Sequence, residues 1–157
     1  MRYICPLLVV EDLKRSRKLY EGVLGQSIKA DYGENITFNG DFALHEKEHF
    51  SGLIAREISL TKHNSMELYF EDDDVASIAQ TIKGMGLEII HDLQEQPWRQ
   101  QVFRFYDYDK HIIEIGESLE HLAFRLHREG QTIEQICKTT YLAKEEVLQA
   151  IKQYSTK

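Results

Sequence analysis

The hydrophobic and polar positions of residues 3–47 predict a strand, a helix and three further strands. Residues 3–10 form a short apolar run that stops at Glu11-Asp12, which is typical of a buried strand followed by a helix start. Helically spaced apolar residues continue to Leu24, and Gly25 ends the predicted helix. The three strand-like pieces lie at residues 26–32, 35–39 and 41–47, and Asn39-Gly40 joins the last two as a hairpin turn.

The same order of elements returns after a polar linker at residues 48–65, which contains His49 and His63. Asp74 opens a helix as Asp12 does in the first half, and Gly86 ends it as Gly25 does. The strands of the second half are predicted at residues 66–71, 87–93, 98–106 and 110–116. The chain is therefore interpreted as two βαβββ units.

This repeat predicts an α+β fold with two modules, at about residues 3–47 and 66–117. A duplicated unit of this size normally buries its sheet against its twin, so we expect a curved eight-stranded mixed sheet with two outer helices. The alternative is a single mixed sheet without internal symmetry. We expect the domain to span residues 1–118.

The last predicted hairpin, at residues 105–115, carries a single acid among isoleucines. Alternation along a strand places Glu114 on the opposite face from Ile113 and Ile115. The acid belongs either to the solvated face of an amphipathic strand or to a functional site.

The remaining residues, 119–157, predict a C-terminal appendage of three helices. Apolar residues recur at helical spacing from Leu119, Gly130 breaks the run, and Thr132 with Gln135 forms a capping box for the second helix. We expect these helices to dock on the sheet or on a second subunit. The faces to be buried are those of Leu122, Leu126, Ile136 and Leu148.

Composition excludes several classes of protein. The length of 157 residues suits one domain with a short appendage, and the net charge of -7 argues against a general affinity for nucleic acid or anionic lipid. No apolar run is long enough to span a membrane. Two cysteines, Cys5 and Cys137, are too few for a disulfide framework, and the N-terminus has no leader pattern, so we expect a reduced, cytoplasmic protein.

Two segments carry a resemblance to a known family. Residues 8–25, from Leu8-Val9-Val10-Glu11-Asp12 to Val23-Leu24-Gly25, resemble the opening of the glyoxalase, bleomycin-resistance and extradiol-dioxygenase superfamily, which has the vicinal oxygen chelate fold. Residues 105–115, with Asp107-Tyr108-Asp109-Lys110 before Ile113-Glu114, resemble its last hairpin. The resemblance covers about residues 3–117. It implies the fold more than the function, because this superfamily includes isomerases, dioxygenases, thiol transferases and drug-binding proteins.

The resemblance also implies a candidate metal site, since four inward side chains hold a metal in that family. Carried over by position, the four ligands are Cys5, His45, Glu67 and Glu114, with Glu46 as the neighbouring alternative to His45. Cys5 departs from the usual histidine or glutamine of the isomerases, and its thiolate favours zinc. Only one histidine lies in a ligand position, which disfavours the iron site of an extradiol dioxygenase.

Two functions follow from this resemblance. The first is a metal-dependent lyase or isomerase of the lactoylglutathione-lyase type, in which a divalent metal, zinc or nickel, stabilises an enediolate while Glu114 or Glu67 moves a proton. The second is a metal-free small-molecule-binding or drug-resistance protein, with Cys5 as a small buried hydrophobe. In either case we expect a small-molecule ligand and a homodimer. Residues expected to contact the ligand are Phe38, Phe42, Tyr69, Trp98, Arg99 and Phe103.

The appendage is also similar to a helix-turn-helix segment over residues 130–147. The helix that would read DNA begins with Glu145-Glu146, which phosphates repel, and basic and acidic residues nearly balance in the tail. We therefore expect no nucleic-acid partner.

Overall fold

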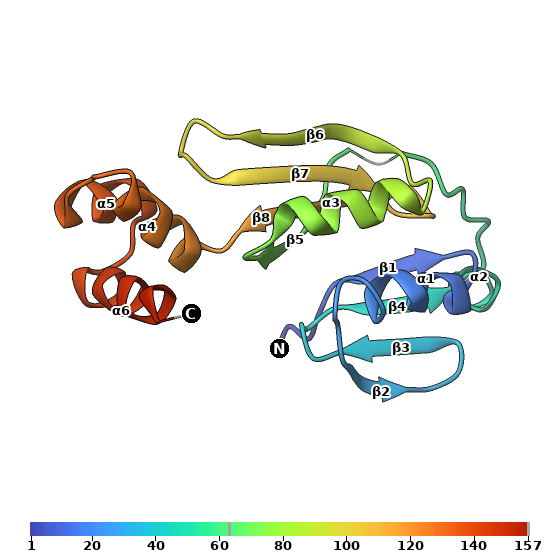
Figure 1. The fold of residues 1–157 in the computed structure, drawn as a ribbon. Coiled ribbons are helices and arrows are strands. Elements are labelled where there is room, and N and C mark those ends of the chain that lie inside the picture. The colour runs from blue at the N-terminus through green and yellow to red at the C-terminus, as the bar shows by residue number, and fades with distance from the viewer. Residues whose placement is uncertain (63, 157) are drawn as a thin grey trace. The chain divides into compact units, whose positions relative to one another are not determined.

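The computed structural model describes residues 1–62 and 64–156, so His63 lies outside the described part. Within these residues, the eight predicted strands form two four-stranded sheets, one from each module (Figure 1). The first contains β1 (Leu7–Val10), β2 (Ile28–Asp31), β3 (Asn35–Phe38) and β4 (Ala43–Glu46). The second contains β5 (Glu67–Asp72), β6 (Ile89–Glu95), β7 (Gln101–Tyr106) and β8 (Ile112–Glu117).

The strand orders confirm the internal repeat. The first sheet runs β1-β4-β3-β2 and the second β5-β8-β7-β6, so in each module the first strand lies beside the fourth. In the first sheet β1 is parallel to β4, with Leu7 opposite Ala43 and Val9 opposite His45. Each module has its helix after its first strand, α1 (Leu13–Tyr20) and α3 (Val75–Gly84). The predicted α+β fold is therefore present, with its eight strands in two sheets.

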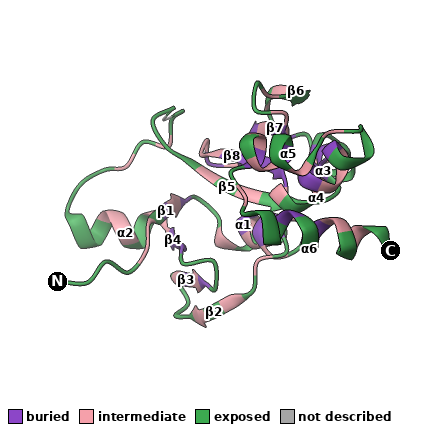
Figure 2. Ribbon diagram, turned by 90° about the vertical axis from the view of Figure 1, so that its left-hand side faces the viewer, coloured by how far each residue is buried: buried purple, intermediate pink, exposed green. Residues whose placement is uncertain are grey.

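The linker contains a helix that the hydrophobic pattern did not predict. Helix α2 (Lys47–Ile54) starts at Glu46, whose carboxylate accepts hydrogen bonds from the backbone N–H groups of Glu48 and His49. It ends at Ala55, whose φ is 51°. None of its residues is buried (Figure 2), so the helix has no apolar face that periodicity could reveal.

The chain divides into two compact units that cut across the modules. Unit 1 contains Met1–Leu68, Thr81–Ile89 and Phe105–Ile113, and unit 2 contains Tyr69–Gln80, Ile90–Arg104 and Glu114–Lys157. In unit 1, Tyr20, Phe38 and Phe42 form an aromatic core, with the last two rings stacked at 4.6 Å between centroids.

Two buried aspartates of the last hairpin hold its turn against α1 within unit 1. Asp107 accepts hydrogen bonds from Tyr20 Oη (2.8 Å), from the N–H groups of Asp109 and His111, and from His111 Nδ1. Asp109 accepts from the N–H of Glu11 (3.0 Å) and from Ser16 Oγ. Burial raises the pKa of the Asp109 carboxyl, and the charge of Asp107 adds to the rise. The acids that mark the family resemblance therefore stabilise the turn.

The three predicted tail helices are α4 (Leu119–Arg128), α5 (Ile133–Thr140) and α6 (Lys144–Ser155). The capping box of Thr132 and Gln135 is confirmed. Six buried residues form a core shared by the three helices: Leu122, Ala123, Leu126, Ile136, Val147 and Ala150. Leu148 is not part of this core and is 48% exposed in the single chain, so its predicted burial against a second subunit stays a prediction. The helices need neither the sheet nor a second subunit to bury the other three predicted positions. No helix in the described part of the chain is long and apolar enough to cross a membrane.

Candidate functional site

His45 is buried at the end of β4, in unit 1, and both of its ring nitrogens have hydrogen-bond partners. Asn35 Nδ2 lies 3.1 Å from His45 Nδ1, and His45 Nε2 lies 2.7 Å from Nδ1 of His49, a residue of α2. Because an amide nitrogen only donates, His45 Nδ1 accepts and Nε2 carries the proton. Burial lowers the pKa of His45, and the nearby His49 lowers it further, so the neutral ring is favoured.

The other predicted ligands of unit 1 have different surroundings. Cys5 lies two residues before β1 and is half-buried, whereas the strand residue opposite His45 is Val9. Glu46 caps α2, and the two backbone hydrogen bonds lower its pKa. Glu67 is exposed at the start of β5 and lines a pocket of about 300 Å³ with Asn64, Ser65, Met66 and Ile112. The structure does not bring Cys5 beside His45.

Glu114 belongs to unit 2 and forms an ion pair with Arg104 on β7. The side chains are 8% and 22% exposed, so the pair is largely buried. Arg104 Nη1 also lies 3.1 Å from Nε2 of His91 on β6, and His91 Nδ1 lies 2.9 Å from the carbonyl oxygen of Asp92. His91 therefore accepts from Arg104 through Nε2 and donates through Nδ1. The predicted catalytic acid is thus neutralised by an arginine that the sequence reasoning missed.

Two predicted ligand-contacting rings, Tyr69 and Trp98, are brought together in unit 2 by Gln100, which is buried. Trp98 Nε1 donates to Gln100 Oε1 (2.9 Å), and Gln100 Nε2 donates to Tyr69 Oη (2.7 Å). The rings are 47% and 45% exposed, respectively, although both are fixed by hydrogen bonds. Gln100 was also missed, because nothing in the sequence pattern separates it from an ordinary loop residue.

The approach of Tyr69 and Gln100 to β8 requires glycine at position 116. A Cβ atom there would lie 2.8 Å from Tyr69 Cε2 and 3.0 Å from Gln100 Nε2. Alternate residues of a strand share a face, so Glu114 and Gly116 point the same way. One face of β8 in unit 2 thus carries the ion pair of Arg104 and Glu114. Beside it lie the rings of Tyr69 and Trp98, which we call the aromatic wall.

The remaining ligand-contacting candidates have structural partners. Phe38 and Phe42 are buried in the aromatic core of unit 1. Phe103 is fully buried and alternates along β7 with Arg104, so it faces away from the ion pair. Arg99 forms ion pairs with Glu95 and Glu129 at 2.8 Å each.

A second buried carboxylate, Glu117, joins β8 to α4 in unit 2. It accepts hydrogen bonds from Arg125 Nε (2.9 Å) and Nη2 (2.8 Å), and from His121 Nδ1 (2.7 Å). Burial raises the pKa of Glu117, but the hydrogen bonds from Arg125 and His121 outweigh it and leave the pKa below its usual value. Arg125 Nη2 also donates to the carbonyl oxygen of Arg99. These contacts attach the tail helices to the second sheet.

A metal ion needs several donors that lie together and are free to bind it. Among the residues that the structure describes, no group of three His, Cys, Asp or Glu residues could hold one. His45 uses both ring nitrogens in hydrogen bonds and Glu114 is paired with a cation. A guanidinium beside a would-be ligand repels a divalent cation. His45 and Glu114 therefore have other partners within their own units, and the four-ligand metal site stays a prediction.

Comparison with known proteins gives one family match and several similar structures. A family model described as a glyoxalase-like domain matches residues 3–120. A search of curated protein sequences finds no match. Among solved structures, a protein of unknown function from Agrobacterium tumefaciens str. C58 is 42% identical, with a TM-score of 0.66, over 75% of this chain and 94% of that one.

Two further structures share the fold. A glyoxalase-related enzyme from Fulvimarina pelagi is 19% identical, with a TM-score of 0.63, over 75% of this chain and 89% of that one. A variant of the fosfomycin resistance protein FosX from Listeria monocytogenes, in complex with Mn(II) and 1S,2S-dihydroxypropylphosphonic acid, is 20% identical. Its TM-score is 0.58, and the match covers 80% of this chain and 98% of that one.

Proposed function

Because the chain belongs to the glyoxalase-like domain family, we propose that it binds a small organic ligand on the face of β8 that carries Glu114 and Gly116, without a metal ion. The observation that carries the proposal is the pair of exposed rings, Tyr69 and Trp98, held by the buried Gln100. Rings fixed in this way offer apolar contact area at little cost in conformational entropy.

The chemistry of this face indicates the class of ligand. Tyr69 and Trp98 favour a flat or apolar portion, and Arg104 with Glu114 offers both a donor and an acceptor for a polar group. Because the two charges neutralise each other, the face selects for hydrogen bonding rather than for net charge. We therefore propose an uncharged ligand with an aromatic or aliphatic part and a polar end.

The second candidate function is a metal-dependent lyase or isomerase, with zinc or nickel held by Cys5, His45, Glu67 and Glu114. Its support is the Mn(II) ion in the FosX complex, which has the same fold. Since His45 and Glu114 are engaged by other side chains, we derive no reaction step from it. The homodimer also stays a prediction.

Substituting Gly116→Ala tests the proposed face. The added Cβ would meet Tyr69 Cε2 at 2.8 Å, so the ring must move and the wall is lost. We expect ligand affinity to fall about tenfold or more, as for the loss of an aromatic contact and its hydrogen bond. Trp98 is the single tryptophan of the chain, so its fluorescence reports binding directly. Ligands would be identified by screening uncharged aromatic compounds against EDTA-treated protein.

The matched control is Gly52→Ala in α2, where an added Cβ meets nothing within 4 Å. This variant should bind as the unmodified protein does, and both variants should keep their circular dichroism spectra. Binding that appears only after a divalent metal is added would contradict the proposal. So would unchanged affinity in Gly116→Ala.

A further inference from the structure

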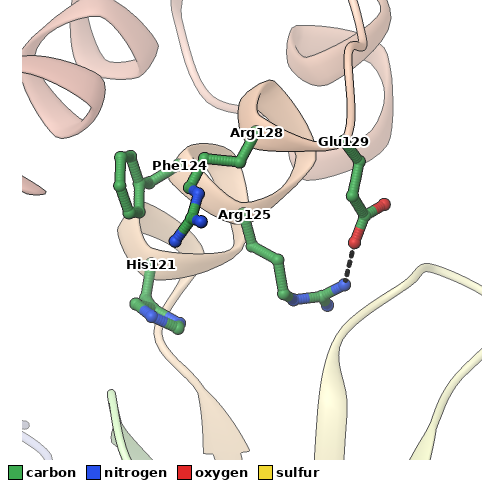
Figure 3. A pocket seen from close by; sticks show the side chains of 5 residues that line it. All are labelled: His121, Phe124, Arg125, Arg128 and Glu129. Atoms are coloured by element: carbon green, nitrogen blue, oxygen red, sulfur yellow. Dashed lines mark hydrogen bonds and ion pairs between the residues drawn. The ribbon is translucent and has the colours of Figure 1, made fainter. Parts of the chain in front are cut away.

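Helix α4 carries a second pocket, separate from the face proposed above. The pocket has a volume of about 380 Å³ and is lined by His121, Phe124, Arg125, Arg128 and Glu129 (Figure 3). His121, Phe124, Arg125 and Arg128 recur at helical spacing on α4, whose other face carries the core residues Leu122, Ala123 and Leu126, and Glu129 is the C-cap of this helix. The volume is at the lower end of the range that small-molecule pockets occupy.

The arginines around this pocket differ in whether they have an acidic partner. Arg125 pairs with Glu117, Glu129 and Glu95, and Arg99 pairs with Glu129 and Glu95, so this network has three acids and two arginines. Arg128 has no ion-pair partner among the described residues, and its guanidinium lies 5.9 Å from the centroid of the Phe124 ring. Figure 3 shows this guanidinium directed toward Phe124 and His121, away from Arg125. Among the described residues that line the pocket, Arg128 is therefore the arginine without an acidic partner.

The wall beside Arg128 is aromatic. Phe124 stacks on Tyr154 of α6, with 5.6 Å between ring centroids, and Tyr154 meets His121 edge-on at 5.4 Å. His121 Nδ1 donates to Glu117, since a carboxylate only accepts. An aromatic wall beside one guanidinium favours a flat ring with a single anionic group.

We propose that this α4 pocket binds a small aromatic monoanion of the aryl carboxylate class, with Arg128 pairing with the carboxylate and Phe124 contacting the ring. A simple inorganic anion would leave the Phe124 wall unused. A polyanion such as a nucleic acid would meet Glu129 at the rim, together with Glu95, which also pairs with Arg125.

The test uses benzoate as the probe and the full-length protein. Isothermal titration calorimetry should give a dissociation constant on the order of 1 mM, as for a ligand of few atoms. Arg128→Gln should weaken benzoate binding about tenfold, because a charge-assisted hydrogen bond is lost. Phe124→Leu should weaken it several-fold, because the apolar contact is smaller. Benzamide, which has the same shape without the charge, should bind at least tenfold more weakly than benzoate.

The matched control is Lys138→Gln, which removes one exposed positive charge from the same tail outside the pocket. It should leave benzoate affinity unchanged. The proposal would be overturned if Lys138→Gln weakened benzoate binding as much as Arg128→Gln does. It would also be overturned if the protein bound benzamide as tightly as benzoate, or if Arg128→Gln bound benzoate with full affinity. Gly116→Ala should also bind benzoate normally, so that failure of this site and failure of the β8 face are distinguishable.

Discussion

Asp107→Ala is expected to lower the free energy of unfolding by about 4 kcal/mol, as the sum of four lost hydrogen bonds at roughly 1 kcal/mol each. The carboxylate is 2% exposed and accepts from Tyr20 Oη, from the N–H groups of Asp109 and His111, and from His111 Nδ1. Its removal leaves these buried donors without an acceptor and detaches the last hairpin from α1. Urea denaturation followed by circular dichroism measures the effect.

Two milder variants distinguish the loss of hydrogen bonds to Asp107 from a general loss of packing. Tyr20→Phe removes one of the four donors and should cost about 1 kcal/mol. Asp107→Asn keeps one acceptor oxygen and should cost less than the alanine variant. A loss below about 1 kcal/mol in Asp107→Ala would show that the turn does not depend on this carboxylate.

Arg125→Met is expected to cost about 3 kcal/mol, because it leaves the carboxylate of Glu117 buried without its cation. The side chains of Glu117 and Arg125 are 3% and 23% exposed, which places the effect at the lower end for a broken buried pair. The double variant Glu117→Leu with Arg125→Met should recover more than half of the loss, since no unpaired charge remains. If the losses of the single variants simply add in the double variant, the pair is not coupled.

The lowered pKa of Glu117 sets the pH dependence of this pair. A carboxyl whose folded pKa lies below its unfolded value, about 4.3, stabilises the protein fully above that unfolded value. The stabilisation is lost as pH falls through the folded pKa. In Arg125→Met, the guanidinium no longer offsets the effect of burial, so we expect the pKa of Glu117 to rise. The loss of stability on acidification should therefore begin at a higher pH than in the unmodified protein.

The fold was predictable because its signals are local and repeated. Asp12 caps α1 through a hydrogen bond from Arg15 N, and Asp74 accepts from Ser77 N at the start of α3, as the matched positions predict. Helix α2 was missed because none of its residues is fully buried. Its contacts are the cap at Glu46 and the packing of His49 and Phe50 against His45. Leu148 was placed inward because helical spacing alone does not show which of several apolar positions the neighbouring helices cover.

The candidate site was only partly predictable. Tyr69, Trp98 and Glu114 were selected, but Gln100 and Arg104, which fix them, were not. Gln100 is 31 residues from Tyr69, whereas Arg104 lies on the strand next in sequence to that of Glu114. One signal was available: Arg104 stands between the aromatic residues Phe103 and Phe105, and a charge inside such a strand needs a partner on its own face. The partner follows from the pairing of β7 with β8, which the predicted hairpin at residues 105–115 already implied.

The most direct test of metal-independent binding is the metal content of the protein at equilibrium. Equilibrium dialysis against Zn(II), Ni(II) and Mn(II), with detection by plasma mass spectrometry, should find far less than one ion per chain, and Glu114→Gln should give the same result. Stoichiometric binding of any of these ions that is lost in Glu114→Gln would contradict the account and restore Glu114 as a metal ligand.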